Sequence, residues 1–137
     1  ASYLGMVGLA PSISEVVVFS PAIDDRVAVM ALNKECFAHL SLTYGDAVVF
    51  VSPLILGREP KDGVLLELLG DVLYLRIFNG GLLFGEAVEV SNDADLLFAV
   101  ESINQVYHIY NMRVRAKGDV ARLKSCFQNL FTDLQCE

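Results

Sequence analysis

The sequence predicts an α/β protein in which a three-stranded antiparallel meander is followed by a helix, a strand and a second helix. Two observations carry this prediction. Residues 64–90 hold three apolar or alternating segments that are separated by glycine-containing turns. Residues 92–134 hold two stretches with apolar residues at helical spacing, one on each side of the short segment "MRVRA". A less regular β-β-α-β segment precedes the meander.

That first segment begins with two β-branched, apolar runs, "EVVVF" (15–19) and "RVAVMAL" (26–32), which predict two strands joined by a loop. Asn33 is suited to cap a helix over "KECFAHLSL". "AVVFV" (47–51) predicts a short buried strand after that helix. The predicted apolar face of the helix consists of Cys36, Phe37, Leu40 and Tyr44.

The stretch "GREPKDG" (57–63) gathers glycine, proline and charge, and it predicts an internal boundary. We expect residues 1–137 to form a single compact domain, because this length is typical of one domain. Within it, residues 1–56 would form the β-β-α-β segment and residues 64–137 the β-β-β-α-β-α segment.

The meander shows the clearest pattern. "VLLELL" (64–69) is almost entirely apolar, as expected of a strand covered on both faces. Gly70-Asp71 predicts a type II′ turn, and Asn79-Gly80 predicts a type I′ turn with positive φ at both residues. Between these turns, "VLYLRIF" (72–78) alternates, which places Leu73, Leu75 and Ile77 on one face. "LLFGEAVEV" (82–90) predicts the third strand.

Two helices follow the meander. Asn92 is suited to cap a long helix that we expect to reach about Tyr110, and Asp119 to cap the last helix. The apolar stripe of the long helix is Leu96, Val100, Ile103, Tyr107 and Tyr110. The predicted buried face of the last helix is Val120, Leu123, Phe127, Leu130 and Leu134.

Composition excludes several classes of function. The chain is 54% hydrophobic, carries a formal charge of −7 and has no basic cluster, so we expect neither nucleic acid nor anionic lipid as a partner. No apolar run is long enough for membrane insertion, and the apolar start lacks the basic residues of a signal peptide. Cys36, Cys126 and Cys136 have no metal-binding spacing, which favours reduced thiols in a cytoplasmic protein.

Short motifs resemble a known fold family. Asn79 to Phe84 reads "NGGLLF" and Asp93 to Phe98 reads "DADLLF". Together with the meander and the helices around them, these motifs resemble the second half of an actin-like ATPase-fold domain, as in pilus-assembly and secretion-system proteins. They resemble more closely an uncharacterised bacterial family of unknown function with that fold. "YLGM", "RVAVMALNKECFAHL" and "VSPLI" are similar to the middle section of that family.

The resemblance implies an actin-like ATPase fold, related to the ribonuclease H-like fold, and it directs attention to two turns. In that superfamily, phosphates bind at the first hairpin and adenosine binds near the turn before the last helix. The corresponding residues here are Gly70, Asp71, Gly118 and Asp119, the candidates for cofactor binding. The neighbours of Gly70 and Asp71 are aliphatic, with no hydroxyl group or lysine for a phosphate, and Asp119 would repel one. The glycines are explained by the turns alone, so we expect no cofactor.

Other chemistry has weaker support. Ribonuclease H-like nucleases hold two metal ions with carboxylates, and Glu67, Glu101 and Asp119 occupy loosely comparable elements. Glu101 lies beside an apolar stripe, however, and an acidic nuclease would repel its substrate. His39 and His108 are isolated, and we expect them to be surface or half-buried groups. The sequence therefore predicts no catalytic residue and no metal ligand.

We expect a non-catalytic interaction or scaffold protein with a degenerate nucleotide site, which self-associates, for example as a homodimer, or binds a protein partner. The alternative is a nucleotide-binding ATPase or a metal-dependent hydrolase of the same fold. Members of the family that the chain resembles are usually about twice as long. We therefore expect this chain to be a C-terminal fragment or a shortened member, with apolar surface left for association.

Overall fold

The structure, a computed structural model, describes residues 13–23, 26–55 and 59–137. The contacts divide the chain into two compact units, Ala1–Gly57 and Arg58–Glu137. The stretch "YLGM" lies outside the described residues, as do Asp24 and Asp25 in the loop between the first two strands.

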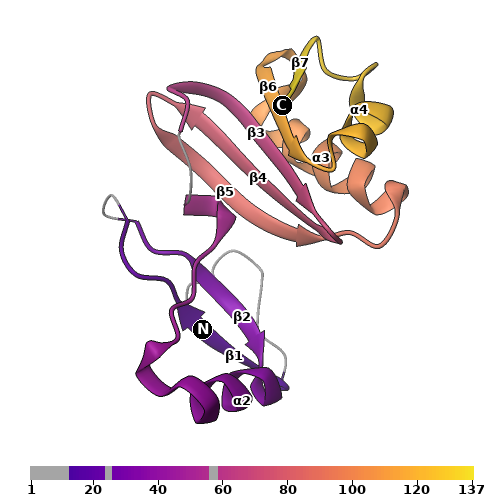
Figure 1. Ribbon diagram of the computed structural model, residues 1–137. Helices are drawn as coiled ribbons and strands as arrows, with labels where there is room; N and C mark the ends of the chain where they lie inside the picture. Colours follow the sequence, from indigo (N-terminus) through magenta and orange to yellow (C-terminus); the bar gives the residue numbers. More distant parts are fainter. Residues whose placement is uncertain (1–12, 24–25, 56–58) are drawn as a thin grey trace. The chain divides into compact units, whose positions relative to one another are not determined.

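The first unit contains a two-stranded antiparallel sheet and a helix. Strand β1 (Glu15–Phe19) pairs with β2 (Val29–Asn33), and Phe19 lies opposite Val29 in the register. Helix α2 (Lys34–Tyr44) begins directly after β2 (Figure 1). The Asn33 side chain caps this helix as predicted, because its Oδ1 accepts hydrogen bonds from the N–H groups of Glu35 and Cys36.

One expectation for this unit is wrong. Residues 47–51 do not form a strand: the 3₁₀ turn η1 (Gly45–Ala47) leads into irregular backbone, and a second 3₁₀ turn, η2 (Pro53–Ile55), follows. An apolar run becomes a strand only where another strand pairs with it, and among the described residues no strand pairs with this run. The apolar residues predicted on one face of α2 are not buried, and Tyr44 is exposed.

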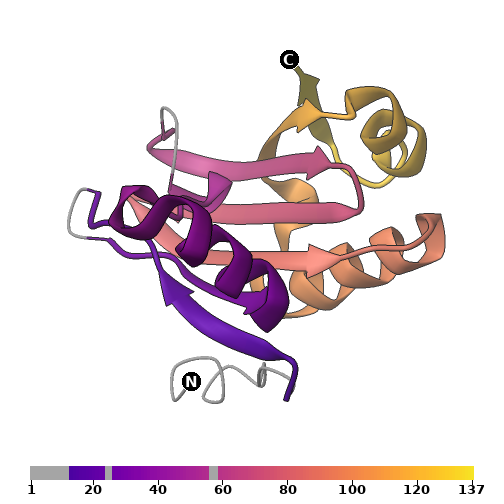
Figure 2. The ribbon, with the colours of Figure 1, turned by 60° about the horizontal axis from the view of Figure 1, so that its bottom comes forward.

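The second unit is built on a mixed five-stranded sheet. Strands β3 (Asp62–Leu69), β4 (Val72–Asn79) and β5 (Leu82–Glu89) form the predicted antiparallel meander. Figure 2 shows the three strands side by side, with β5 leading toward helix α3 (Asp93–Tyr107). Strand β6 (Arg113–Gly118) pairs in parallel with β3, and β7 (Asp133–Cys136) pairs in parallel with β6. The order across the sheet is therefore β5-β4-β3-β6-β7.

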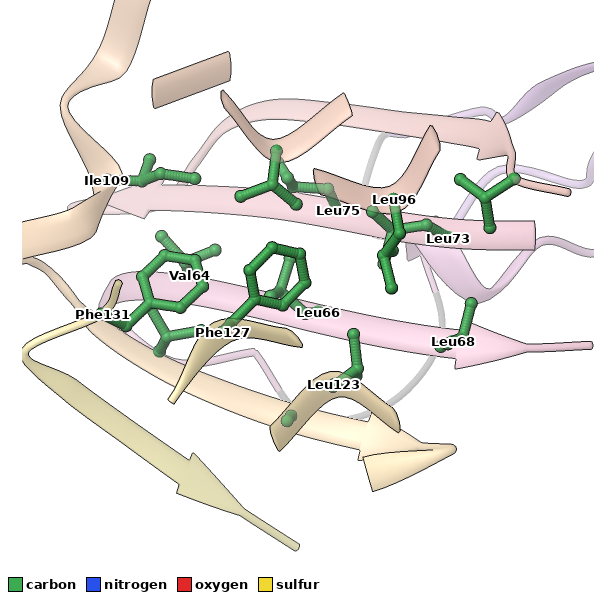
Figure 3. Packing of buried hydrophobic residues seen from close by; sticks show 14 of the residues in the cluster. Val64, Leu66, Leu68, Leu73, Leu75, Leu96, Ile109, Leu123, Phe127 and Phe131 are labelled. Atoms are coloured by element: carbon green, nitrogen blue, oxygen red, sulfur yellow. The ribbon is translucent and has the colours of Figure 1, made fainter. Parts of the chain in front are cut away.

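Helices α3 and α4 (Val120–Phe127) cover one face of this sheet, and the main core lies between them and the strands. Figure 3 shows Leu123 and Phe127 of α4 pointing toward the strand that carries Leu66 and Leu68. The predicted alternation of β4 is confirmed, because Leu73, Leu75 and Ile77 all belong to this core, whereas the residues between them do not. The core-facing residues of the three central strands are Val64, Leu66, Leu68, Leu73, Leu75, Ile77, Val114 and Ala116.

The helix ends differ from the sequence prediction. Helix α3 ends at Tyr107 because His108 adopts the left-handed conformation, and a 3₁₀ turn, η3 (Ile109–Asn111), then carries Tyr110. Helix α4 ends at Phe127, and Leu134, which we expected on its buried face, belongs to β7. Backbone pairing with β6 explains this difference. Among the described residues there are three α-helices, and none is long and apolar enough to cross a membrane.

Candidate functional site

The four residues that the sequence nominates for a cofactor lie at one end of the five-stranded sheet. Gly70 and Asp71 form the turn after β3, and Gly118 ends β6, the parallel neighbour of β3. The backbone N–H of Asp119 donates a hydrogen bond of 2.9 Å to the carbonyl oxygen of Leu68, which joins the two strand ends. The structure therefore brings these residues together at the carboxyl ends of two parallel strands, where α/β sheets commonly bind ligands.

Close packing of the backbone explains Gly118. Its φ is +77°, and a Cβ atom placed there would lie only 2.2 Å from the carbonyl oxygen of Leu68. Only glycine permits this approach between β6 and β3. Gly70 has a φ of +59°, and Asp71 has no positive φ. These two angles are the pattern of the predicted type II′ turn. Both glycines thus have structural reasons that involve no ligand.

The turn between β4 and β5 differs from the prediction. Positive φ occurs at Gly80 and Gly81, but not at Asn79, so this is not a type I′ turn centred on Asn79-Gly80. The register shifts between Ile77 and Phe78, and the Asn79 N–H donates to the carbonyl oxygen of Gly81. A bulge adds a residue to one strand of a hairpin and changes the turn that closes it. The turn lies at the opposite end of β4 from Gly70.

Carboxylates and capping side chains occupy the end of the sheet that holds the four nominated residues. The side chain of Asn92 caps α3, and the Asp119 carboxylate caps α4 by accepting the Arg122 N–H. The Asp93 carboxylate binds Nε of Arg122 at 2.8 Å, which links the beginnings of the two helices. The amino ends of the helices, which attract anions, are therefore satisfied by the chain itself. A triphosphate would also meet the negative charges of Asp71, Asp93 and Asp119.

The thiol of Cys126, on α4, is affected by one of these carboxylates. Burial raises the pKa of Cys126, and the negative charge of Asp93 raises it further. A thiol with a raised pKa holds less of the thiolate form that acts as a nucleophile. The geometry at this end of the sheet therefore favours neither phosphate binding nor cysteine chemistry.

The carboxylates and histidines that the sequence analysis considered for metal binding or catalysis do not lie together in one site. Glu67 projects from the face of β3 opposite α3 and α4, whereas Glu101 lies on α3 and Asp119 at the end of β6. Within the described ranges, no group of three histidine, cysteine, aspartate or glutamate residues could hold a metal ion. His39 and His108 are both exposed, on α2 and directly after α3.

An apolar hollow on the α3 side of the second unit is the surface feature that the sequence did not reveal. Leu97, Phe98 and Glu101 of α3, Tyr110 of η3 and Leu130 after α4 line a volume of about 330 Å³. We call this surface the α3 hollow. Phe98, one of these lining residues, is 76% exposed. Leu97 and Phe98 directly follow the buried Leu96, so the apolar residues at this point of α3 are too many for one buried stripe. This excess was the sequence signal that could have revealed an exposed apolar surface.

The floor of the α3 hollow is held in place by Tyr110. Its ring packs edge-on against Phe131 of the core at 5.3 Å, and its N–H donates to Oδ1 of Asn104. Its hydroxyl donates to the Glu101 carboxylate at the rim. Burial, and then this hydrogen bond to Glu101, raise the pKa of Tyr110 to about 12, so it stays protonated at neutral pH. The α3 hollow is thus an apolar surface with a fixed floor and one carboxylate engaged by the protein itself.

Comparison with known proteins gives one informative result. No protein-family model matches the chain, and no curated protein sequence matches it. A solved structure from Bacteroides thetaiotaomicron, described as a protein with an actin-like ATPase fold and unknown function, matches with a TM-score of 0.70 at 13% sequence identity. The match covers 99% of this chain and 59% of that protein, so this chain spans less than two thirds of its length. The likeness confirms the resemblance found in the sequence: this chain has the fold of an actin-like ATPase-fold protein of unknown function.

Proposed function

We propose that this chain is a non-catalytic interaction protein with an actin-like fold, and that it self-associates through the α3 hollow. The observation that carries the proposal is the exposed ring of Phe98 beside an apolar hollow. Large apolar side chains that are grouped and exposed mark interaction surfaces more often than isolated ones do. The occupant that we propose for the hollow is a second copy of the chain.

The shape of this surface favours a second copy. In a two-fold symmetric dimer the same surface of both copies meets, so the surface must be complementary to itself. The α3 hollow meets this condition, because a projecting ring and a depression lie next to each other. Under two-fold symmetry, Phe98 of each copy would enter the hollow of the other copy. Burying the ring would contribute about 1.5–3 kcal/mol per copy.

The charge at the rim is compatible with this arrangement. Each hollow contributes the Glu101 carboxylate, and two like charges brought together would oppose the contact. The Tyr110 hydroxyl already donates to that carboxylate, which disperses part of its charge. Because the chain carries a net charge of −7, we expect the association to strengthen as salt screens the repulsion between copies.

A degenerate nucleotide site is the second part of the proposal. Its support is the close packing at Gly118 and the carboxylates around the turns. Magnesium–ATP at millimolar concentration should leave the melting temperature unchanged, because a ligand that binds the native state must raise it. If magnesium–ATP raised the melting temperature, and Asp119→Asn changed this rise while the control Asp46→Asn did not, the ATPase alternative would be supported instead.

We also propose that the protein works in the cytoplasm. The three cysteines are free thiols, and Cys36 and Cys136 are exposed. Exposed, unpaired thiols suit a reducing compartment. Recovery of the natural protein from outside the cell would oppose this assignment.

The association is tested by size-exclusion chromatography with light scattering over a range of concentrations. The wild-type chain should approach twice the 15.0 kDa mass of one copy as its concentration rises, and Phe98→Ser should stay a monomer. Val106→Ser is the matched control, because Val106 is an exposed apolar residue of α3 that does not line the hollow. It should associate like the wild type.

Three outcomes would contradict the proposal. The first is a wild-type chain that remains monomeric at the highest soluble concentration. The second is a Phe98→Ser variant that associates normally. The third is equal loss of association in both variants, because the hollow would then have no special role. Circular dichroism must show that both variants keep the wild-type fold.

A further inference from the structure

A groove of about 360 Å³ opens on the second unit, at the beginning of β3 and along β6 and β7. Its polar lining comes mainly from Lys61 and Asp62 of the β3 entry, Arg113 and Arg115 of β6, and Gln135 of β7. Pro60 adds apolar surface, whereas the Val64 side chain belongs to the core and is almost fully buried. Its lining residues do not include those of the α3 hollow, so the two sites can be tested independently.

The side chains that line this groove carry more positive than negative charge, unlike the whole chain, and the carboxylates of Asp133 and Glu137 lie beside its two arginines. The formal charge of the protein is −7, whereas the lining holds three cationic side chains and one carboxylate, that of Asp62. This carboxylate is engaged, because its Oδ1 accepts a hydrogen bond of 2.9 Å from the Gly80 N–H. Positive charge concentrated in a depression raises the local concentration of anions.

The backbone holds the cationic groups in a fixed arrangement. Arg113 and Arg115 are two positions apart on β6, so both project from the sheet face opposite to Val114 of the core. The β3 entry that carries Lys61 is held against β6, since a Cβ atom at Gly63 would lie 2.7 Å from the carbonyl oxygen of Arg113. Preorganised donors bind an anion with less loss of conformational freedom than mobile ones.

Both arginines already have carboxylate partners that a ligand can replace. Nε of Arg113 lies 3.4 Å from Oδ2 of Asp133, and Nε of Arg115 lies 3.1 Å from Oε1 of Glu137. These pairs are substantially exposed, and exposed ion pairs contribute little to stability. A guanidinium group also carries N–H donors on both Nη atoms, and its planar fork matches phosphate and carboxylate oxygens.

We propose that this groove binds a small phosphate monoester. The dianionic phosphate would lie against Lys61, Arg113 and Arg115, and the amide of Gln135 would add a hydrogen bond. The organic group would contact Pro60. The volume lies within the range of small-molecule sites, about 300–1,000 Å³, and it leaves room for more than a bare phosphate.

The test is isothermal titration calorimetry on the full chain at low ionic strength, with phenyl phosphate and inorganic phosphate as probes. Phenyl phosphate should bind more tightly than inorganic phosphate, because the ring adds a contact with Pro60. The double variant Arg113→Gln/Arg115→Gln should weaken the binding of phenyl phosphate at least tenfold. The matched control is Lys34→Gln/Lys124→Gln, which removes the same charge at exposed residues outside the lining and should bind like the wild type.

A third variant tests the predicted exchange of partners. Asp133→Asn removes the carboxylate that competes for Arg113, so it should tighten the binding of phenyl phosphate. Undetectable binding by the wild-type chain, or equal weakening in the two double variants, would overturn the proposal. Inorganic phosphate that binds as tightly as phenyl phosphate would overturn the assignment to an ester. Thermal unfolding of every variant establishes that the fold is kept.

Discussion

Replacement of Gly118 by alanine tests whether this glycine is present for packing. The added Cβ atom would lie 2.2 Å from the carbonyl oxygen of Leu68, far inside van der Waals contact, at a φ of +77°. The left-handed conformation costs about 1 kcal/mol for a residue other than glycine. Overpacking against backbone adds about 1–3 kcal/mol. We therefore expect Gly118→Ala to lower the free energy of unfolding by about 3 kcal/mol.

Gly80→Ala provides the matched control. Gly80 also has a positive φ, +69°, but no atom lies within 4 Å of a Cβ placed there, so only the conformational cost of about 1 kcal/mol applies. The difference between the two variants isolates the contact between Gly118 and Leu68. Urea unfolding followed by tyrosine fluorescence suits this comparison, because Tyr74, Tyr107 and Tyr110 all lie in the second unit.

The reasoning would be refuted if the two variants lost equal stability. Equal loss would mean that the end of β3 moves aside without cost, and that Gly118 is not fixed by its contact with Leu68. A ligand-binding role for this glycine would then regain support.

Three further predictions concern the core, a helix cap and a half-buried carboxyl group. Phe127→Ala should lower the free energy of unfolding in urea by about 3–5 kcal/mol, because the ring is fully buried in the core; a loss below about 1 kcal/mol would show that the core is wrongly placed. Asp119→Ala should cost about 1 kcal/mol in the same assay, because the cap of α4 is lost, and Asp119→Asn should recover most of that stability. Burial raises the pKa of Glu86, so the carboxyl group keeps its proton to a higher pH in the native state than in the unfolded state. The free energy of unfolding therefore falls as the pH rises from 4.5 through the raised pKa, because the charged carboxylate is disfavoured in the native state. Glu86→Gln should therefore raise the melting temperature more at neutral pH than below pH 4.5, and a gain independent of pH would contradict this.

The sequence predicted the elements whose signals are local. The alternation of Leu73, Leu75 and Ile77 identified the core face of β4, and the capping residues Asn92 and Asp119 identified where two helices begin. Side-chain alternation and capping depend on residues close together in the chain, so a pattern can reveal them. The α/β class followed from these elements, whereas the actin-like fold was implied by the resemblance of short motifs and agrees with the solved structure.

Two of the errors have the same physical origin, because pairing between distant segments decided whether a strand formed. The apolar run at 47–51 was expected to be a strand, but no strand among the described residues pairs with it. Leu134 was expected on a helix, but its segment pairs with β6 instead. The α3 hollow was missed for a related reason, because Tyr110 and Leu130 meet Leu97 only in the folded chain.

The most direct test of the central proposal is a dilution series followed by methyl NMR of the full chain. If Phe98 enters the α3 hollow of a second copy, the methyl resonances of Leu97 and Leu130, which line it, should shift with concentration. Those of Leu83, an exposed leucine of β5, should stay constant. Resonances of Leu97 and Leu130 that do not change up to millimolar concentration, or changes confined to Leu83, would contradict the proposal.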